Sequence, residues 1–412
     1  MQCKRVVVTG MGGITAIGSD WNTVERNLRA GVTGIEYMAD WERYKELNTR
    51  LGAPVKDFKL PPHYTRKKTR TMSRVAQLAV LATEYALTQA QLLDDPCIQD
   101  GRMGIAHGSC SGGFDAFVEF GGMMWGGEAG RQLNATTFLR FMAHTAGVNI
   151  GLYFGLKGRI IPTTSACTSG SQGVGYAYES IKYGKQLLMA AGGSEELHAA
   201  DAAVFDTMFA TSTRNAEPKQ TPRPFDKARD GLVIGEGAGT LILEELEHAQ
   251  ARGAKILAEV VGFGCNSDGD HATHPNTATM QVAMELALQD AGLPASAIGY
   301  VSAHGTSTEQ GDIAESQATE RLFGSRMPIS SMKSYLGHTL GACGAIESWW
   351  AIEMMNRGWF APTHNLTHVD ERCGRLDYIV GEGRNLYCDY VMNNNFAFGG
   401  INTSLIFKRW AS

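Results

Sequence analysis

The stretch Thr163-Thr164-Ser165-Ala166-Cys167-Thr168-Ser169-Gly170-Ser171-Gln172-Gly173 places one cysteine where a strand gives way to a helix. Residues 158–162 before it predict a short buried strand, and residues 174–183 after it have the apolar spacing of a helix. A helix N-terminus favours an anion, so we expect the Cys167 thiol to lose its proton readily and act as a nucleophile. The alternative is a small buried cysteine without chemistry, and this stretch alone does not decide between them.

The composition is that of a folded α/β protein. The chain has 412 residues, 43% hydrophobic content, 19% charged content and 49 glycines, which is enough for two domains or one doubled domain. A formal charge of −5 argues against bulk nucleic-acid binding. The eight cysteines show neither CxxC pairs nor a zinc signature, so we expect reduced thiols, no metal and a cytoplasmic location. With no signal peptide and no long apolar run, we expect no membrane insertion.

Strands and helices alternate along both halves of the chain. The spacing predicts strands at 5–10, 102–108, 187–193, 239–244, 258–264, 298–303, 378–380, 390–393 and 403–408, and helices at 75–87, 277–291, 313–322 and 345–356. This alternation predicts a layered α/β sandwich made of two similar halves around a shared site. The glycines at 10–18 predict a turn, because their spacing is not GxGxxG and no acidic residue follows at the distance a dinucleotide site needs.

Two segments suggest contact surfaces. Residues 64–74 carry five cations in eleven residues, which indicates either a solvated helix entry or a landing site for an acidic partner. Residues 115–157 are rich in aromatic residues and methionine, which suits a subunit contact, an apolar pocket or ordinary core packing.

Three later motifs bear on function. Residues 301–308 put His304 just past a strand, residues 331–342 bring Lys333 and His338 together before a helix, and residues 393–402 form a glycine turn with an aromatic residue in it. Any single histidine is more often structural than catalytic. Four such groups, Cys167 included, each in a loop at a strand end, favour one shared catalytic site.

With these motifs in hand, the chain resembles a β-ketoacyl-acyl-carrier-protein synthase of the elongating, decarboxylating class, within the thiolase superfamily. The resemblance runs from residues 6–10 to residues 399–402 and includes the motifs at 212–215, 223–227, 229–231 and 235–239. It implies a duplicated five-layer αβαβα sandwich. Residues 1–250 would form the half with the nucleophile and the dimer-contact insertions, and residues 251–412 the half with both histidines, the lysine and a phenylalanine gate.

The resemblance also implies a mechanism. An acyl group would pass from carrier protein to Cys167, and malonyl carrier protein would then lose carbon dioxide and attack the acyl-cysteine. His304 and His338 match the histidines that hold the malonyl thioester oxygen, and the backbone N–H groups of Cys167 and Phe398 match the oxyanion hole. Lys333 matches the family's active-site lysine, with Glu347 as its carboxylate partner.

Other roles follow from the same resemblance. They comprise substrate contacts at Thr306, Thr308, Ser111, Phe396 and Asp268, structural support from Asp312 and Glu315, an aromatic gate at Phe398, and carrier-protein docking at Lys67 and Arg70. No cofactor is implied, because the substrates are carried on the phosphopantetheine arm of acyl carrier protein. The chain would form a homodimer or a heterodimer with a related ketosynthase.

The sequence departs from the family pattern at three places. Ala397 stands where the gate usually has glycine, Ile401 replaces a threonine of the same turn, and Ser111 stands where an apolar residue commonly limits acyl length. The more polar lining favours a specialised ketosynthase, for example one that makes polyenes or other polyketides, over the housekeeping fatty-acid enzyme. His271 and His274 form a possible metal pair, but the resemblance favours a role in a mobile loop.

Competing assignments fit less well. A thiolase needs a second cysteine in the turn at 393–402, which has none, and the initiating ketosynthases carry asparagine where His338 stands. The serious alternative is a non-catalytic or partner-dependent subunit of the chain-length-factor type. Such subunits normally lack the nucleophile, and Cys167 argues against that assignment.

Overall fold

The computed structural model describes residues 3–125 and 135–411, and within them eleven strands form one mixed sheet in the order β13-β11-β10-β15-β16-β9-β1-β8-β6-β4-β5. The strands of this sheet are β1 (Val6–Thr15), β4 (Met103–Gly108), β5 (Ile160–Thr163), β6 (Leu188–Glu195), β8 (Gly237–Glu245), β9 (Ala258–Ser267), β10 (Tyr300–Ser302), β11 (Pro328–Ser330), β13 (Asp377–Tyr378), β15 (Tyr390–Ala397) and β16 (Ile401–Arg409). Two small sheets consist of β2 (Glu36–Tyr37), β3 (Leu51–Ala53) and β7 (Ile234–Gly235), and of β12 (Trp359–Phe360) and β14 (Arg384–Asn385).

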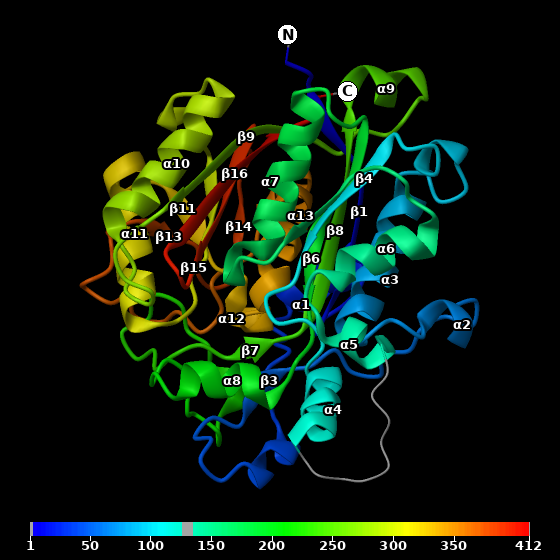
Figure 1. Ribbon diagram of the computed structural model, residues 1–412. Coiled ribbons are helices and arrows are strands. Elements are labelled where there is room, and N and C mark those ends of the chain that lie inside the picture. The colour runs from blue at the N-terminus through cyan, green and yellow to red at the C-terminus, as the bar shows by residue number, and fades with distance from the viewer. Residues whose placement is uncertain (1–2, 126–134, 412) are drawn as a thin grey trace.

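The helices cover both faces of this sheet (Figure 1). They are α1 (Trp21–Arg29), α2 (Arg66–Thr69), α3 (Arg74–Gln89), α4 (Phe114–Trp125), α5 (Ala135–Phe141), α6 (Thr145–Phe154), α7 (Ser169–Lys182), α8 (Ala199–Asp206), α9 (Leu246–Ala251), α10 (Thr277–Ala291), α11 (Glu309–Phe323), α12 (Lys333–Leu336) and α13 (Cys343–Arg357). None of the helices in the described ranges is long and apolar enough to cross a membrane.

The sheet contains the same arrangement twice. The order β5-β4-β6-β8-β1 in the first half has its counterpart in β11-β10-β15-β16-β9 in the second. In each half the first three strands of this order pair in parallel and the remaining neighbours pair antiparallel. The two halves join edge to edge where residues 6–8 of β1 pair with residues 258–260 of β9. The predicted thiolase-like α/β fold is confirmed.

The layers follow from this repeat. Helices α7 and α13 pack on each other and lie between the two half-sheets, while α3 covers the outer face of one half and α10 that of the other (Figure 1). Their apolar side chains, such as Val174, Trp349 and Trp350, belong to the central core cluster. Burying one large apolar side chain stabilises the fold by roughly 1.5–3 kcal/mol, so the central helices are held firmly. Both begin at the same end of the sandwich, and the site forms there.

Two local predictions were wrong. The glycines after residue 10 continue strand β1 instead of turning, because a Cβ at Gly10 or Gly12 would lie 2.2–2.3 Å from carbonyl oxygens of α3, so glycine lets that helix approach the strand. The strand before Cys167 is not buried: β5 is the last strand of the sheet, and Ile160 is 40% exposed. Of the aromatic segment 115–157, residues 126–134 lie outside the described residues.

Candidate active site

The nucleophile turn is held by short hydrogen bonds. After β5, the chain passes through a single 3₁₀ turn (Ala166–Thr168) into α7, and Ala166 has a left-handed φ of 49°. The Thr163 hydroxyl donates to the Ser169 carbonyl at 2.8 Å, and the Ser169 hydroxyl donates to the Ala166 carbonyl at 2.7 Å. The Cys343 thiol donates to the Cys167 carbonyl at 3.2 Å. The cysteine is therefore fixed at the start of α7.

Both predicted histidines meet this cysteine. The Nε2 atom of His338 lies 2.9 Å from the Sγ atom of Cys167, and the rings of His304 and His338 are nearly perpendicular with centroids 5.1 Å apart. All three side chains are buried. His338 is fixed through its backbone, whose N–H donates to the Val233 carbonyl at 2.6 Å and whose carbonyl accepts from Gly235.

A buried ion pair fixes the tautomer of His304. Lys333 forms an ion pair with Glu347 and also contacts the Nδ1 atom of His304 at 3.2 Å, while Asn395 donates to the second Glu347 oxygen at 2.7 Å. Burial acts to lower the pKa of Lys333, but Cys343 and Glu347 outweigh it and raise that pKa, so the ammonium keeps its proton. Since an ammonium only donates, Nδ1 of His304 accepts and its Nε2 carries the hydrogen.

The protonation states run partly against expectation. Burial holds the pKa values of His304 and His338 well below the usual histidine range, and Lys333 lowers both further, so both rings are neutral. Burial raises the pKa of the Cys167 thiol to about 11, although Lys333 and the backbone N–H groups of Phe398 and Cys167 act in the opposite direction. The predicted easy loss of the thiol proton is therefore wrong, because desolvation outweighs the groups that favour the anion.

Two buried carboxylates hold the loop that carries His304. Glu315 accepts hydrogen bonds from the backbone N–H groups of His304 and Gly305, both at 2.7 Å. Asp312 accepts from the N–H groups of Phe225 and Ser307 and lies 3.5 Å from the Arg229 guanidinium. Neither carboxylate contacts Cys167 in the described structure, and both act on the loop that positions the histidine.

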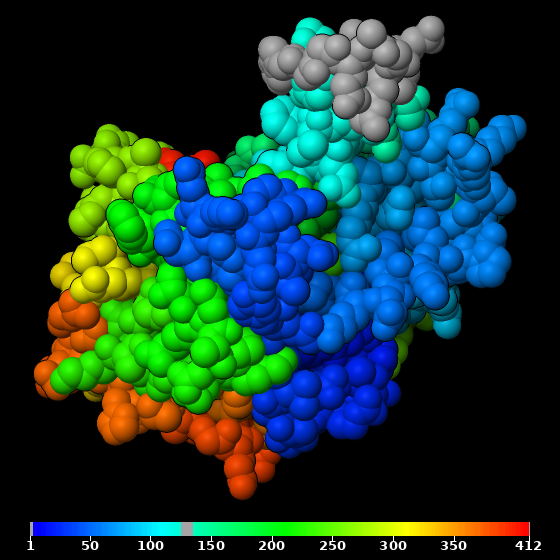
Figure 2. Space-filling view, turned by 90° about the horizontal axis from the view of Figure 1, so that it is seen from below, coloured from blue at the N-terminus to red at the C-terminus, as the bar shows by residue number. Residues whose placement is uncertain are grey.

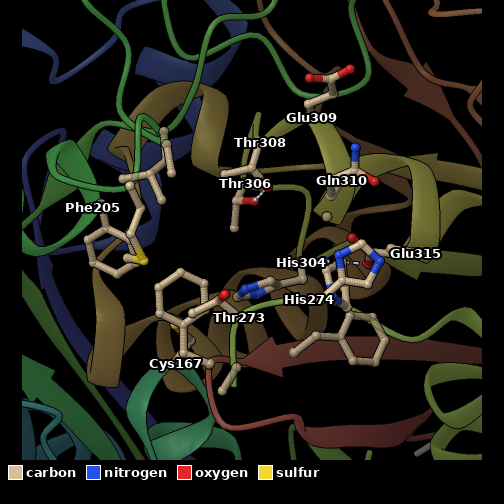
Figure 3. A pocket seen from close by; sticks show the side chains of 18 of the residues that line it. Cys167, Phe205, Thr273, His274, His304, Thr306, Thr308, Glu309, Gln310 and Glu315 are labelled. Carbon is tan, nitrogen blue, oxygen red and sulfur yellow. Dashed lines mark hydrogen bonds between the residues drawn. The ribbon is translucent and has the colours of Figure 1, made fainter. Parts of the chain in front are cut away.

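A cavity of about 430 Å³ leads to these groups. Cys167 and His304 lie at its floor, with Thr306 and Thr308 along one wall and Phe205 on another (Figure 3). The two threonine hydroxyls are 2.9 Å apart. Phe396 also lines the cavity, with its ring centroid 6.2 Å from that of His304.

The turn that carries Phe398 is tied to the neighbouring loop. The Gly399 N–H donates to the Ala272 carbonyl at 2.7 Å, and the Asp268 N–H donates to the Gly400 carbonyl at 2.8 Å. The Asp268 carboxylate accepts from Asn402 at 2.7 Å, so this residue braces the turn as well as lining the cavity. The His271 ring accepts the Thr273 and His274 N–H groups, both at 3.1 Å, as a residue that shapes a loop does.

Two groups of side chains bring together residue types that commonly bind metal ions. Donor atoms of Cys167, His304 and His338, and of His304, Cys343 and Glu347, lie within 4.8 Å of one another. Lys333 already places a cation between His304 and Glu347. A second cation there would face direct repulsion, which favours proton chemistry over metal binding at this position.

Some predicted residues lie away from this centre. Lys67 and Arg70 are exposed on and beside α2, which projects from one side of the molecule (Figure 1). Ser111 lies behind the nucleophile turn and donates to Asp201 at 2.9 Å. Sequence reasoning assigned no role to Asn395, although it lies within the predicted 393–402 motif, and it missed helix α8, whose Phe205 ring lies 5.0 Å from that of Phe398.

The duplicated fold and the buried cysteine between two neutral histidines place the chain in the thiolase superfamily. The family model for the β-ketoacyl synthase N-terminal domain matches residues 3–249, and that for the β-ketoacyl synthase C-terminal domain matches residues 257–367. The chain belongs to the β-ketoacyl synthase family.

Individual proteins agree with this assignment. The chain is 37% identical to a 3-oxoacyl-[acyl-carrier-protein] synthase 2 of Vibrio harveyi, over 100% of both chains. A crystal structure of a β-ketoacyl synthase from Burkholderia phymatum STM815 is 60% identical, with a TM-score of 0.97 over 99% of this chain and 100% of that one. A ketosynthase in complex with its type II polyketide acyl-carrier protein is 30% identical, with a TM-score of 0.87 over 99% of this chain and 100% of that one.

The raised pKa of Cys167 predicts a steep pH dependence. Alkylation of Cys167 by iodoacetamide should speed up about tenfold per pH unit between about pH 7 and about pH 9, because the thiolate fraction rises tenfold per unit below the pKa. Mass spectrometry of the Cys167 peptide measures the rate, with free glutathione as the reference thiol. The Lys333→Met variant should react more slowly, since a group that lowers this pKa is gone. A rate that levels off below about pH 9 would contradict the assignment.

Proposed function

We propose that the protein is a 3-oxoacyl-[acyl-carrier-protein] synthase that elongates acyl chains by decarboxylative condensation. The observation that carries this proposal is the 2.9 Å contact between Cys167 and His338, with the His304 ring beside it. Lys333 contacts His304 at Nδ1, so the Nε2–H of His304 remains available to a substrate. A nucleophile and two neutral N–H donors around one cavity are what acyl transfer followed by carbanion formation needs.

In the first half-reaction, the Cys167 sulfur attacks the thioester carbon of an acyl group carried on the phosphopantetheine arm of acyl carrier protein. The carbon–sulfur bond to the carrier breaks, and the carrier thiol leaves. The backbone N–H groups of Cys167 and Phe398, which already act on the Cys167 sulfur, are placed to stabilise the oxyanion of the intermediate.

In the second half-reaction, malonyl carrier protein takes the place of the first carrier. The Nε2–H groups of His304 and His338 donate to its thioester oxygen as carbon dioxide leaves and negative charge develops there. The resulting carbanion attacks the acyl-cysteine carbonyl, and the Cys167–carbon bond breaks. Lys333, Glu347 and Asn395 act as positioning residues, because they hold the tautomer of His304.

Loading of the cysteine tests this proposal directly. Incubation with a panel of saturated and unsaturated acyl carrier proteins should add one acyl mass to the wild type and none to Cys167→Ala, read by intact mass spectrometry. His304→Ala should still load but should release carbon dioxide from malonyl carrier protein at least about 100-fold more slowly. Cys388→Ala, at a buried cysteine outside the site, is the matched control.

The loading experiment also separates the competing functions. The acyl group that loads onto Cys167 most readily decides between a fatty-acid role and a polyketide role. If no donor loads the isolated chain, the catalytic proposal fails, and a partner-dependent subunit of the chain-length-factor type becomes the better account.

The basic helix α2 supports docking of an acidic carrier protein. Arg66, Lys67, Lys68 and Arg70 are exposed, and within the part of the chain that the structure describes none of them pairs with a carboxylate. Exposed cations without a carboxylate partner, clustered in a net acidic chain, attract an acidic partner and speed its association.

Charge reversal tests the docking surface. Lys67→Glu combined with Arg70→Glu should raise the KM for acyl carrier protein about tenfold or more and leave kcat for a free acyl-pantetheine thioester unchanged, because only the protein contact is lost. Arg321→Glu combined with Arg326→Glu, two exposed reversals at the end of α11, is the control. Equal effects of both pairs, or an effect on the free thioester, would refute docking at α2.

Apolar side chains around α4 to β5 support dimer formation. Six apolar side chains on α4, α5, α6 and β5 are at least 40% exposed: Phe117, Val118, Phe138, Leu139, Leu152 and Ile160. The outer edge of β5 is unpaired among the described strands. In Figure 2 the segment that carries α4 rises from the rest of the surface. Exposed apolar area next to an open strand edge is suited to a second chain of the same kind.

Sedimentation velocity tests this interface. The wild type should sediment at twice the mass of one chain, and Leu152→Glu should sediment as a monomer because a charge would be buried in the contact. Val282→Glu, at an equally apolar exposed position on α10, should remain dimeric. A monomeric wild type would instead favour a heterodimer with a related ketosynthase, which co-expression would reveal.

A further inference from the structure

A buried carboxylate behind the nucleophile has an unused oxygen. Ser111, on the loop after β4, donates its hydroxyl to Oδ1 of Asp201 on α8 at 2.9 Å. Asp201 is 3% exposed, and its Oδ2 atom is buried with no hydrogen-bond partner among the described residues. Leaving such an oxygen unpaired costs about 1–3 kcal/mol, so a group that supplies the missing bond would be favoured.

The two neighbouring carboxylates have hydrogen-bond partners on both of their oxygens. Glu195 accepts hydrogen bonds from the Ser109 hydroxyl and from the N–H groups of Cys110, Ser111 and Gly341. Glu196 accepts from the N–H groups of Val75 and Phe114. Those carboxylates serve the fold. Asp201 accepts the Ser111 hydroxyl on Oδ1, its carboxyl group also lies near the His198 backbone N–H, and its Oδ2 atom has no hydrogen-bond partner among the described residues.

The position of the Ser111–Asp201 pair relative to the nucleophile follows from packing. Cys110, the neighbour of Ser111, packs in the same apolar cluster as Cys167 and Phe398. Asp201 and Phe205 are four residues apart and lie on one face of α8, and the Phe205 ring packs at a tilt of 38° against that of Phe398. The pair therefore lies beyond the Phe205–Phe398 contact, on the α8 side of Cys167, while the histidines and Lys333 lie on the other.

We propose that the Ser111–Asp201 pair binds a hydroxyl group on the acyl chain carried by Cys167, so that the substrate class is hydroxylated acyl chains. The inference rests on the proposed function, since the chain must be attached to Cys167. Phe205, one turn of α8 from Asp201, lines the cavity that holds Cys167 and offers an apolar contact to the carbon chain, and Oδ2 of Asp201 receives the hydroxyl.

A hydroxyl group suits this site in either charge state. Burial raises the pKa of Asp201, against the effect of the Ser111 hydrogen bond, so protonation of the carboxyl group is easier here than in water. A hydroxyl donates to the carboxylate and accepts from the carboxylic acid. An unsubstituted alkyl chain does neither and would leave Oδ2 unpaired.

Paired substrates test the inference. Each acyl carrier protein carrying a terminally hydroxylated chain is compared with the one carrying the unsubstituted chain, at short, medium and long chain lengths, and the rate of Cys167 loading is read by intact mass. At its best length the wild type should prefer the hydroxylated member by about tenfold or more, because a buried polar site rejects an analogue that lacks the hydroxyl. In Asp201→Leu the preference should disappear or reverse.

The controls keep the outcomes separate. Ser111→Ala should weaken the preference without abolishing loading, and it keeps the test open if Asp201→Leu does not fold. Ser180→Ala removes a hydroxyl at the far end of α7 and should leave the preference as it is in the wild type. Loading without a hydroxyl preference at any length would overturn this inference alone. No loading from any donor would overturn the proposed function and this inference with it.

Discussion

The buried ion pair between Lys333 and Glu347 is the interaction on which the site depends. Removing two charges from water is expensive, and the attraction between them repays the cost only when the remaining hydrogen bonds are satisfied. Asn395 supplies one of these bonds to Glu347, and His304 accepts another from Lys333. The pair thereby sets which nitrogen of His304 carries hydrogen. Losing one partner would leave an unpaired charge among Cys167, His304 and Cys343, all of which are buried.

The doubled fold explains how these groups meet. Each half has a residue with left-handed φ just before its central helix, Ala166 at 49° before α7 and Leu340 at 45° before α13. In the first half the next residue is the nucleophile, whereas in the second half it is Gly341. A Cβ at Gly341 would lie 2.6 Å from the Cys110 nitrogen and 2.7 Å from Glu195. The turn before α7 thus carries a reactive side chain, and the equivalent turn before α13 carries none. The absence of a side chain at Gly341 lets the second half pack closely against the first behind the cysteine.

The sequence predicted the elements of this arrangement better than its electrostatics. Strand and helix periodicity, with the resemblance to a known family, placed Cys167, His304, Lys333 and His338 at strand-end loops, and the structure brings them together. Local sequence patterns gave wrong predictions where tertiary contacts decide the structure of a segment. The glycines of β1 predicted a turn because nothing in the sequence shows that α3 lies against them, and β5 was taken as buried because its place at the sheet edge depends on the order of all the strands. Helix α8 was missed, and with it the partner of Ser111.

The Cys167 pKa was misjudged for a related physical reason. A helix N-terminus favours the thiolate and can be inferred from sequence, whereas the effect of Lys333 on the thiol and the extent of desolvation are seen only in the structure. The structure makes desolvation the larger effect. Prediction from sequence therefore identified one effect that favours the thiolate, but not the other groups that act on the thiol or the balance between them.

That balance constrains the chemistry of acyl transfer. With a thiol of raised pKa 2.9 Å from a histidine of lowered pKa, forming a free thiolate or an imidazolium before attack would place an unfavourable charge in a buried site. Thioester exchange avoids this, because the proton that Cys167 loses is the proton that the departing carrier thiol needs. The net reaction changes no charge in the cavity. The burial that raises the pKa of Cys167 is therefore compatible with rapid exchange between two thiols, provided that proton loss and bond formation occur together.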